Sequence, residues 1–230
     1  MGKLFGTDGI RGVVNAGLDA DLAYKVGLAA AIVLSKDKKP GEKPLVTIGK
    51  DTRISGDLLK GSLIAGLCTA GADVLDLGTL PTPGVAWVTV DEGADAGIVI
   101  SASHNPFEHN GIKIFKGDGY KLPDEVENQI EAHVFNNCTD IRLAEGADIG
   151  RIKMCRTGVK DYVDFLQEHI DADLTGLKVL FDCANGASAR VAQELFPRLG
   201  CECGFIGTQQ DGVSVNDGCG STHLETLEAA

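Results

Sequence analysis

The sequence predicts an α/β fold, with three-layer α/β/α domains built around a mainly parallel but mixed sheet, a complete first domain and an incomplete second. Short, almost wholly apolar segments alternate with longer segments whose apolar residues recur at helical spacing. This alternation is typical of a parallel sheet covered by helices on both faces. The 30 glycines provide for many tight turns between these elements. Aromatic residues make up only 5% of the 230 residues, so aliphatic side chains must fill the core.

The first domain is expected at residues 1–150. Its expected helices span residues 19–34, 58–70, 82–90 and 123–135, and its expected strands span residues 45–49, 73–77, 96–100 and 111–115. Ser55 and Asp57 are candidate N-caps of the second helix, and Pro83 suits the first turn of the third. Because the last strand follows its predecessor after only a short loop, we expect these two strands to pair antiparallel.

A second α/β unit is expected at residues 159–230, after a polar connecting region at 136–158. Its expected elements are a helix at 159–170, a strand at 177–181, a helix at 188–199, a strand at 202–206 and the opening of another helix at 224–230. Two parallel strands alone leave open edges and an uncovered sheet face. We therefore expect this second domain to be truncated, with further C-terminal domains missing or a partner supplying the rest.

Charge and cysteine content narrow the class of protein. The chain has 21 basic and 33 acidic residues, a net charge of −12, which argues against nucleic acid as a partner. The seven cysteines are an odd number and include no Cys-x-x-Cys pair, so we expect reduced thiols and a cytoplasmic location. The start has no signal-peptide pattern, and the longest apolar stretch, residues 26–34, is too short to span a membrane.

The run Ser101-Ala102-Ser103-His104-Asn105-Pro106 follows an apolar strand directly. Loops after the carboxyl ends of parallel strands form the ligand crevice of α/β proteins. Ser103 is placed there as a nucleophile or phosphate carrier, with His104 able to share transferred charge and Asn105 to hydrogen-bond it. A plain turn, in which Ser and Asn cap the backbone and Pro stops the strand, is the alternative interpretation.

Two further segments combine glycine with a basic residue. The run Gly6-Thr7-Asp8-Gly9-Ile10-Arg11-Gly12 sets a forked, permanent cation among residues that let backbone amides approach a phosphate. The run Gly49-Lys50-Asp51-Thr52-Arg53-Ile54-Ser55-Gly56 puts Lys50 and Arg53 at the exit of the first apolar strand. The first spacing fits neither standard phosphate-loop pattern, and the second also suits a solvated loop.

Lys113 lies in Asn110-Gly111-Ile112-Lys113, between Ile112 and Ile114. On a strand, its side chain points to the face opposite its apolar neighbours. It is therefore either exposed to solvent or part of the lining of a cleft.

Taken together, these runs resemble the α-D-phosphohexomutase superfamily. The resemblance extends over the whole chain and includes Asp182-Cys183-Ala184-Asn185-Gly186 and Asn216-Asp217. The opening Phe5-Gly6-Thr7-Asp8-Gly9-Ile10-Arg11-Gly12 looks most like the phosphoglucosamine mutases of that superfamily. Phosphoglucomutases and phosphomannomutases share similar openings, so they remain the alternative within it.

The resemblance implies a phosphoserine enzyme that interconverts glucosamine 6-phosphate and glucosamine 1-phosphate, feeding UDP-N-acetylglucosamine and peptidoglycan precursors. Ser103 would carry the phosphoryl group, and glucosamine 1,6-bisphosphate would be the intermediate. Arg11, Lys113 and His104 would act with it in catalysis. Thr7, Lys50, Arg53 and Asn105 would bind substrate or phosphate. Mg²⁺ would bind through the Ser103 phosphate, and a homodimer is the expected assembly.

The chain departs from the family pattern in one respect. The superfamily's Asp-Gly-Asp-x-Asp type of metal loop does not occur in these 230 residues, nor does a later sugar-recognition loop. We therefore expect this polypeptide alone to bind Mg²⁺ weakly and to lack mutase activity. A non-catalytic phosphate-binding or assembly module is the alternative from a different functional class.

Overall fold

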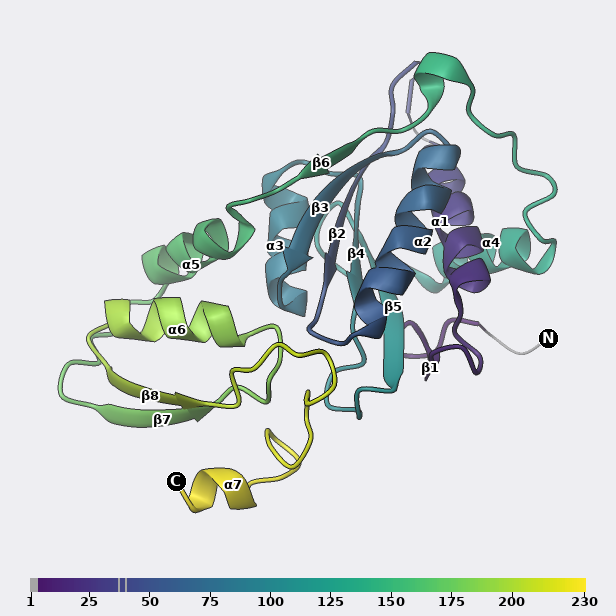
Figure 1. Ribbon diagram of the computed structural model, residues 1–230. Coiled ribbons are helices and arrows are strands. Elements are labelled where there is room, and N and C mark those ends of the chain that lie inside the picture. The colour runs from purple at the N-terminus through teal and green to yellow at the C-terminus, as the bar shows by residue number, and fades with distance from the viewer. Residues whose placement is uncertain (1–3, 37, 40) are drawn as a thin grey trace.

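The computed structural model describes residues 4–36, 38–39 and 41–230, and it contains two separate sheets (Figure 1). The larger sheet has the strand order β1-β5-β4-β2-β3-β6, and the smaller consists of β7 and β8. The strands are β1 Ile10–Val13, β2 Leu45–Lys50, β3 Asp73–Thr79, β4 Ala96–Ile100, β5 His109–Lys116, β6 Ile152–Met154, β7 Lys178–Asp182 and β8 Glu202–Ile206. β1 and β4 pair antiparallel with β5, and all other neighbours pair parallel, so the large sheet is mixed as predicted.

Helices cover both faces of the large sheet, which gives the expected three layers (Figure 1). The helices are α1 Ala20–Leu34, α2 Ser55–Thr69, α3 Thr82–Asp91, α4 Asp124–Phe135, the short 3₁₀ helix Gly146–Asp148, α5 Gly158–His169, α6 Ala189–Arg198 and α7 Glu225–Glu228. α1, α2 and α4 pack on one face of the sheet and α3 packs on the other.

Strand alternation explains which side chain meets which layer. Ile98 and Ile100 of β4 point into the core that α1, α2 and α4 share, and Val99 between them packs with α3. On β5, Ile112 and Ile114 join the first core while Phe115 joins the second. The odd-numbered positions of β5 therefore face the α3 side, and this places Lys113 there.

α1 and α2 approach each other closely through glycines. A Cβ on Gly66 would lie 2.1 Å from the Tyr24 carbonyl oxygen, and one on Gly27 would lie 2.4 Å from the Leu63 carbonyl oxygen. The two backbones can therefore touch only because these positions lack side chains. At the start of α1, the Asp19 carboxylate caps the helix by accepting a bond from the Leu22 amide at 2.8 Å.

The predicted cap of α2 is wrong. The helix already includes Ser55 and Asp57, and Ile54 at the N-cap position offers no side-chain hydrogen bond. The Ile54 amide donates instead to the Gly212 carbonyl at 2.8 Å, and the Ser55 hydroxyl accepts from the Asn110 amide at 3.0 Å. Contacts distant in sequence thus take the place of a local cap.

Two strands lie where the sequence indicated loops. β1 includes Arg11 within the glycine-rich opening, and β6 lies inside the segment expected to be only a connection. β6 pairs with β3, so the larger sheet extends to Met154. The division at residues 150 and 159 stays a prediction, although the separate second sheet is in keeping with it.

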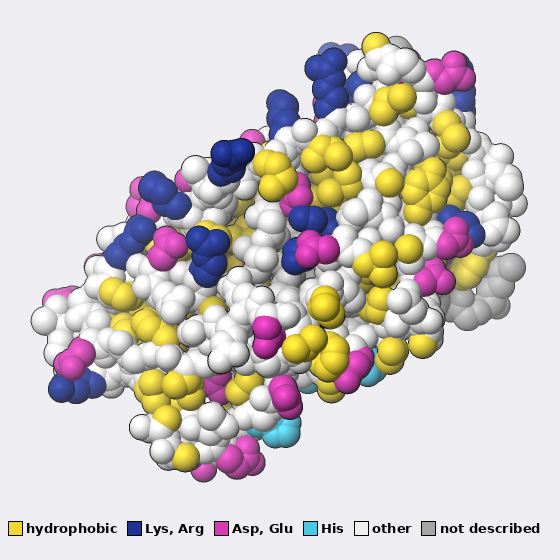
Figure 2. All heavy atoms as spheres, viewed as in Figure 1, with side chains coloured by type: hydrophobic (Ala, Val, Ile, Leu, Met, Phe, Trp, Pro, Cys, Tyr) yellow, Lys and Arg dark blue, Asp and Glu magenta, His cyan; other side chains and the backbone are white. Residues whose placement is uncertain are grey.

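The second unit packs α6 beside α5, and α5 rests against α3. Its small core contains Val163, Val191 and Leu195, and Trp87 of α3 packs against it. The rings of Trp87 and Phe165 stack with centroids 4.9 Å apart. Hydrophobic side chains remain visible on the surface over this unit, at the lower left of the space-filling view (Figure 2).

Candidate active site

The loop after β4 holds Ser103 in an uncommon backbone conformation. Its φ is +57°, in the left-handed region, which costs an L-residue about 1–2 kcal/mol. The Ser103 amide donates to the Ser101 hydroxyl at 3.1 Å, and the Asn105 amide donates to the Ala102 carbonyl at 3.2 Å. Ser101 and Ala102 are buried while Ser103 and His104 are exposed. Ser103 is thus exposed to solvent at the end of β4, in a loop whose first residues are buried and hydrogen-bonded.

Two carbonyl groups of this loop share two donors. The Ser103 oxygen accepts from Arg53 Nη2 at 3.1 Å and from Asn216 Nδ2 at 2.9 Å. The Asn105 oxygen accepts from the same two atoms, at 2.6 Å and 3.0 Å. These contacts can fix the loop in its left-handed turn and offset the conformational cost at Ser103.

Arg53 lies beneath the loop rather than on its surface. Its side chain is fully buried, and its guanidinium forms an ion pair with Asp51. The Asp51 amide in turn donates to the Ile100 carbonyl at 2.9 Å, which ties the pair to the end of β4. The Arg53 guanidinium thus binds the backbone of the serine loop and Asp51. Its contact with phosphate stays a prediction.

Arg11 and Lys113 lie on the α3 side of the sheet. Arg11 is the register partner of Gly111, two residues before Lys113 on β5. The Arg11 guanidinium pairs with the Asp8 carboxylate at 2.9 Å. Burial lowers the pKa of the Lys113 ammonium, the Arg11 charge lowers it further, and Asp8 opposes this shift. The three groups are thus electrostatically coupled.

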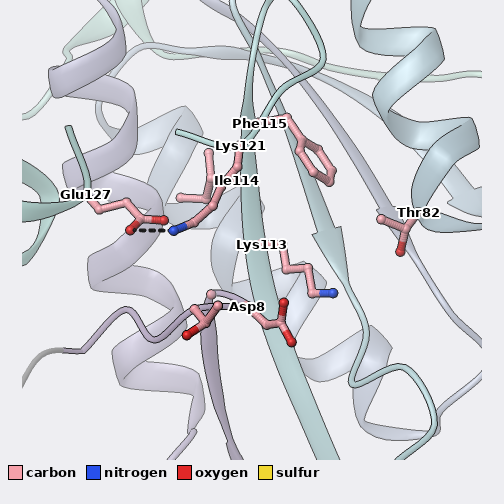
Figure 3. A pocket seen from close by; sticks show the side chains of 9 residues that line it. Asp8, Thr82, Lys113, Ile114, Phe115, Lys121 and Glu127 are labelled. Atoms are coloured by element: carbon pink, nitrogen blue, oxygen red, sulfur yellow. Dashed lines mark ion pairs between the residues drawn. The ribbon is translucent and has the colours of Figure 1, made fainter. Parts of the chain in front are cut away.

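Lys113 lines a cavity of about 190 Å³ next to the start of the chain. Its side chain extends into the cavity with Asp8 beside it, and the ion pair of Lys121 and Glu127 lies to one side (Figure 3). The lining residues are Thr7, Asp8, Gly9, Thr82, Lys113, Ile114, Phe115, Lys121 and Glu127. Of the two possibilities for Lys113, the structure therefore selects the cleft lining, and it adds Thr7 to the same cleft.

Gly111 connects this basic region to the serine loop. The Ser101 amide donates to the Gly111 carbonyl at 3.0 Å. A Cβ on Gly111 would lie 2.9 Å from the Ser101 carbonyl oxygen and 3.1 Å from Arg11 Cγ. Because Gly111 has no side chain, Arg11 can lie close to the base of the Ser103 loop.

Lys50 belongs to the opposite face of the sheet. Its side chain lies against Gly56 in the first turn of α2, and its ammonium pairs with Asp57 at 3.3 Å. The structure therefore brings Arg11, Lys113 and Thr7 together but separates Lys50 from them. A role of Lys50 in phosphate binding stays a prediction, as does that of His104.

Comparison with known proteins assigns the chain to a family. The family model for the α/β/α domain I of phosphoglucomutase/phosphomannomutase matches residues 2–140, more than half of the chain. The chain belongs to the phosphoglucomutase/phosphomannomutase family. This assignment agrees with the superfamily resemblance of the three motifs.

Several curated relatives are about half identical to the chain. A phosphoglucosamine mutase of Acetivibrio thermocellus is 52% identical over 228 residues, which is 99% of this chain and 50% of the relative. One of Alkaliphilus oremlandii is 52% identical over 230 residues, 100% of this chain and 51% of the relative. The chain thus spans about half the length of the curated relatives it matches.

Solved structures in this family share the fold. A phosphoglucomutase/phosphomannomutase family protein of Burkholderia thailandensis is 29% identical, with a TM-score of 0.75 over 91% of this chain and 45% of that one. Parafusin, a phosphoglucomutase of Paramecium, is 18% identical, with a TM-score of 0.70 over 99% of this chain and 47% of that one. The second similarity concerns the fold alone.

The family's expected Mg²⁺ finds no matching set of ligands here. Among the residues that the structure describes, no group of three or more His, Cys, Asp or Glu side chains is placed to hold a metal ion. Asp51, whose partner Arg53 binds the serine loop, is buried and paired with that arginine. The described residues therefore show no cluster of ligands from which to place the ion. Separately, no described helix is long and apolar enough to cross a membrane.

Sequence reasoning did not identify the contacts of Asn216 with the serine loop. Asp182 and Asn185, which belong to a run on which the family resemblance rests, organise the loops of the second unit. The Asn185 side chain donates to the Ser214 carbonyl at 3.0 Å and accepts from the Gln209 amide at 2.8 Å. The Asp182 carboxylate accepts from the Ala184 amide at 2.8 Å and the Gly220 amide at 2.6 Å. Asn216 has a φ of +60°, which asparagine tolerates well, but no local pattern reveals its contact with Ser103.

Proposed function

We propose that the chain is the phosphoserine-bearing half of a phosphoglucosamine mutase. Such an enzyme interconverts glucosamine 6-phosphate and glucosamine 1-phosphate through glucosamine 1,6-bisphosphate, upstream of UDP-N-acetylglucosamine and the cell wall. The observation that carries this proposal is the exposed, left-handed Ser103 at the exit of β4, beside the region of Arg11 and Lys113. The names of the relatives that match nearly the whole chain support the choice of sugar.

The transfer would proceed in two balanced steps. The free hydroxyl oxygen of the sugar phosphate attacks the phosphorus on Ser103 and gives up its proton to a basic group of the site. The new O–P bond forms, the Ser103 Oγ–P bond breaks, and Oγ takes up a proton. The bisphosphate then turns over, and its other phosphoryl group returns to Ser103 Oγ as the bond to the sugar oxygen breaks. Phosphoryl transfer depends mainly on positioning and charge neutralisation.

The basic residues have separate roles in this scheme. Arg11 stabilises the charge of the moving phosphoryl group. Lys113, whose pKa lies below its usual value, releases a proton more readily than a free lysine and is suited to exchange one with the sugar hydroxyl. Thr7 lines the same cavity and can hydrogen-bond the substrate. Mg²⁺, where bound, would neutralise phosphate charge, but the described residues offer no set of ligands from which to derive its place.

The decisive test is the modification of Ser103 in the natural protein that carries this sequence. Intact mass and peptide mapping should find one phosphate, on Ser103, and turnover of glucosamine 6-phosphate should exceed that of mannose and glucose phosphates. Ser103→Ala should lower turnover by about 10³-fold or more, because it removes the covalent carrier. A persistently unmodified Ser103 would contradict the proposal, and a preference for mannose phosphate would move the protein to the alternative branch.

The 230-residue chain by itself is expected to show no mutase turnover above a Ser103→Ala control. The physical reason is that the described residues include no gathered carboxylate site to hold Mg²⁺ beside the Ser103 phosphate. Coupled detection of glucosamine 1-phosphate measures this, and turnover that Ser103→Ala abolishes would contradict the expectation.

Location and assembly complete the proposed function. The seven cysteines are free thiols, as expected in a reducing compartment, and we place the protein in the cytoplasm. A homodimer follows from the family resemblance. Light scattering of the natural protein should give twice the monomer mass, and a strictly monomeric species would remove this part of the proposal.

A further inference from the structure

Asn216 connects the second unit to the serine loop. It lies in the loop after β8, and its side-chain amide donates to the Ser103 carbonyl at 2.9 Å and to the Asn105 carbonyl at 3.0 Å. These partners are 113 and 111 residues away in sequence. Asn216 is itself anchored, because its backbone amide donates to the Ala184 carbonyl at 3.0 Å.

The two donors that hold the loop come from different units. Arg53 belongs to the loop after β2, and it is buried and bonded to Asp51 within the first unit. Asn216 belongs to the second unit and is only partly buried. Since both donors bond the same two carbonyl oxygens, those oxygens lie close together, and each repels the other unless a donor lies between them.

Two further hydrogen bonds join the second unit to the loop between β2 and α2. The Thr52 hydroxyl donates to the Asn185 carbonyl at 2.6 Å, and the Ile54 amide donates to the Gly212 carbonyl at 2.8 Å. A Cβ on Gly212 would come within 3.0 Å of the Ile54 backbone. This close seat fixes where Asn216 stands relative to Ser103.

We propose that Asn216 is a positioning residue for Ser103. Its amide, acting with Arg53, holds the carbonyls of Ser103 and Asn105 and so maintains the left-handed turn that presents the serine. The readiness of Ser103 therefore depends on how the second unit is docked. This inference rests on the proposed function only in that Ser103 is the residue that carries phosphate.

The principal test is Asn216→Asp, which keeps the shape but replaces the donor by an acceptor facing two carbonyl oxygens. Backbone hydrogen exchange of the 230-residue chain, at Ser103 and Asn105, should become about tenfold faster or more. Amides of β4 serve as the internal standard for folding. Unchanged exchange at the loop in the folded variant would overturn the proposal.

The matched control is Thr52→Val, which removes another bond between the units without touching the loop carbonyls. Exchange at Ser103 and Asn105 should then stay within about twofold of the unmodified chain. If this control loosens the loop as much as Asn216→Asp does, docking in general and not Asn216 orders the loop, and the proposal is wrong. Should Asn216→Asp disturb folding, Asn216→Ala takes its place with the same expected direction.

A pH series separates donation from space filling. Acidification protonates the carboxyl introduced by Asn216→Asp and returns one donor to the site. After correction for intrinsic exchange rates, protection of the loop should recover as the pH falls through the pKa of that carboxyl. A side chain that only filled space would show no such recovery, because its shape is the same at every pH.

The phosphate measurement keeps the two proposals distinguishable. In the natural protein, Asn216→Asp should slow phosphoryl transfer from glucosamine 1,6-bisphosphate to Ser103 by about tenfold or more, and Thr52→Val should not. The exchange experiments use unphosphorylated chain, so they decide the positioning role whether or not Ser103 ever carries phosphate. An unmodified Ser103 would end the proposed function alone, and unaltered loop exchange would end the positioning role alone.

Discussion

The two units follow the same rhythm of strands and helices but bury their strands to different degrees. All five residues of β4, in the middle of the large sheet, are buried, and Ile98 is completely inaccessible. None of the five residues of β7 is buried, and Leu180 is 36% exposed. The large sheet has helices on both faces, while the two-stranded sheet has α6 beside β8 and only the four-residue α7 near β7 (Figure 1).

This difference shows that the second unit depends on contacts outside its own sheet. Its small core takes in Trp87 from α3, and its loops are bonded to Thr52 and to the carbonyl of Ser103. The first unit, by contrast, owes most of its stability to its own buried layers. The serine loop lies where the first unit, which has the larger core, contacts the second unit.

The largest effect on the free energy of unfolding should come from shortening one side chain in β4, compared with the same change in β7. Ile98→Ala removes a fully buried side chain and should lower the free energy of unfolding by about 2–5 kcal/mol. Leu180→Ala, at a partly exposed position of β7, should lower it by about 1 kcal/mol or less. Urea unfolding followed by circular dichroism measures both. Equal losses would mean that β7 is as well covered in solution as β4, and the comparison would fail.

The second prediction concerns the close contact between α1 and α2 in the first unit. Gly66→Ala places a methyl group against the Tyr24 carbonyl and should destabilise the chain by about 1–3 kcal/mol. Gly61→Ala is the matched control on the same helix, because a Cβ there meets nothing within 4 Å. It should stabilise the chain by up to about 1 kcal/mol. Thermal denaturation of the two variants should shift the midpoint in opposite directions, and a common direction would refute the close-packing argument.

The smallest effect concerns pH and Lys113. Its pKa is lowered in the folded chain, so between that value and the unfolded value of 10.5 the unfolded chain binds more protons. The free energy of unfolding should therefore gain a rising contribution as the pH increases through this window. Lys113→Met should remove this contribution. The same substitution at Lys116, exposed on the same strand, is the control for lost charge. An identical pH dependence in the two variants would contradict the prediction.

Sequence patterns predicted those elements that can be recognised from their own residues and the turns around them. β4 and β8 have the predicted bounds, although only β4 is a wholly apolar, buried run, since β8 begins with Glu202 and has no buried residue. β1 was not predicted because Arg11 and Gly12 interrupt its apolar residues, and only pairing with β5 makes it a strand. β6 has three exposed residues and no periodic signal, so its pairing with β3 is a purely tertiary feature.

The candidate site also has features that local sequence predicts and features that depend on tertiary contacts. The exit of β4 placed Ser103 correctly in a loop, and strand alternation gave Lys113 its face of the sheet. The burial of Arg53 and the separation of Lys50 depend on which neighbours reach each charge, Asp51 in one case and Asp57 in the other. Both carboxylates are close in sequence, but the Ser103 and Asn105 carbonyls that bind Arg53 are 50 and 52 residues away. The motif alone therefore does not show that Arg53 is buried.

The stacking of Trp87 on Phe165 has a practical consequence. The chain contains one tryptophan, and that residue sits on α3 against the aromatic face of α5, with Tyr162 at 5.8 Å. Its indole emission therefore comes entirely from the junction of the two units. Any ligand or variant that shifts one unit on the other changes the polarity around this single fluorophore. The molecule thus has an intrinsic, label-free optical reporter of the geometry between its two units.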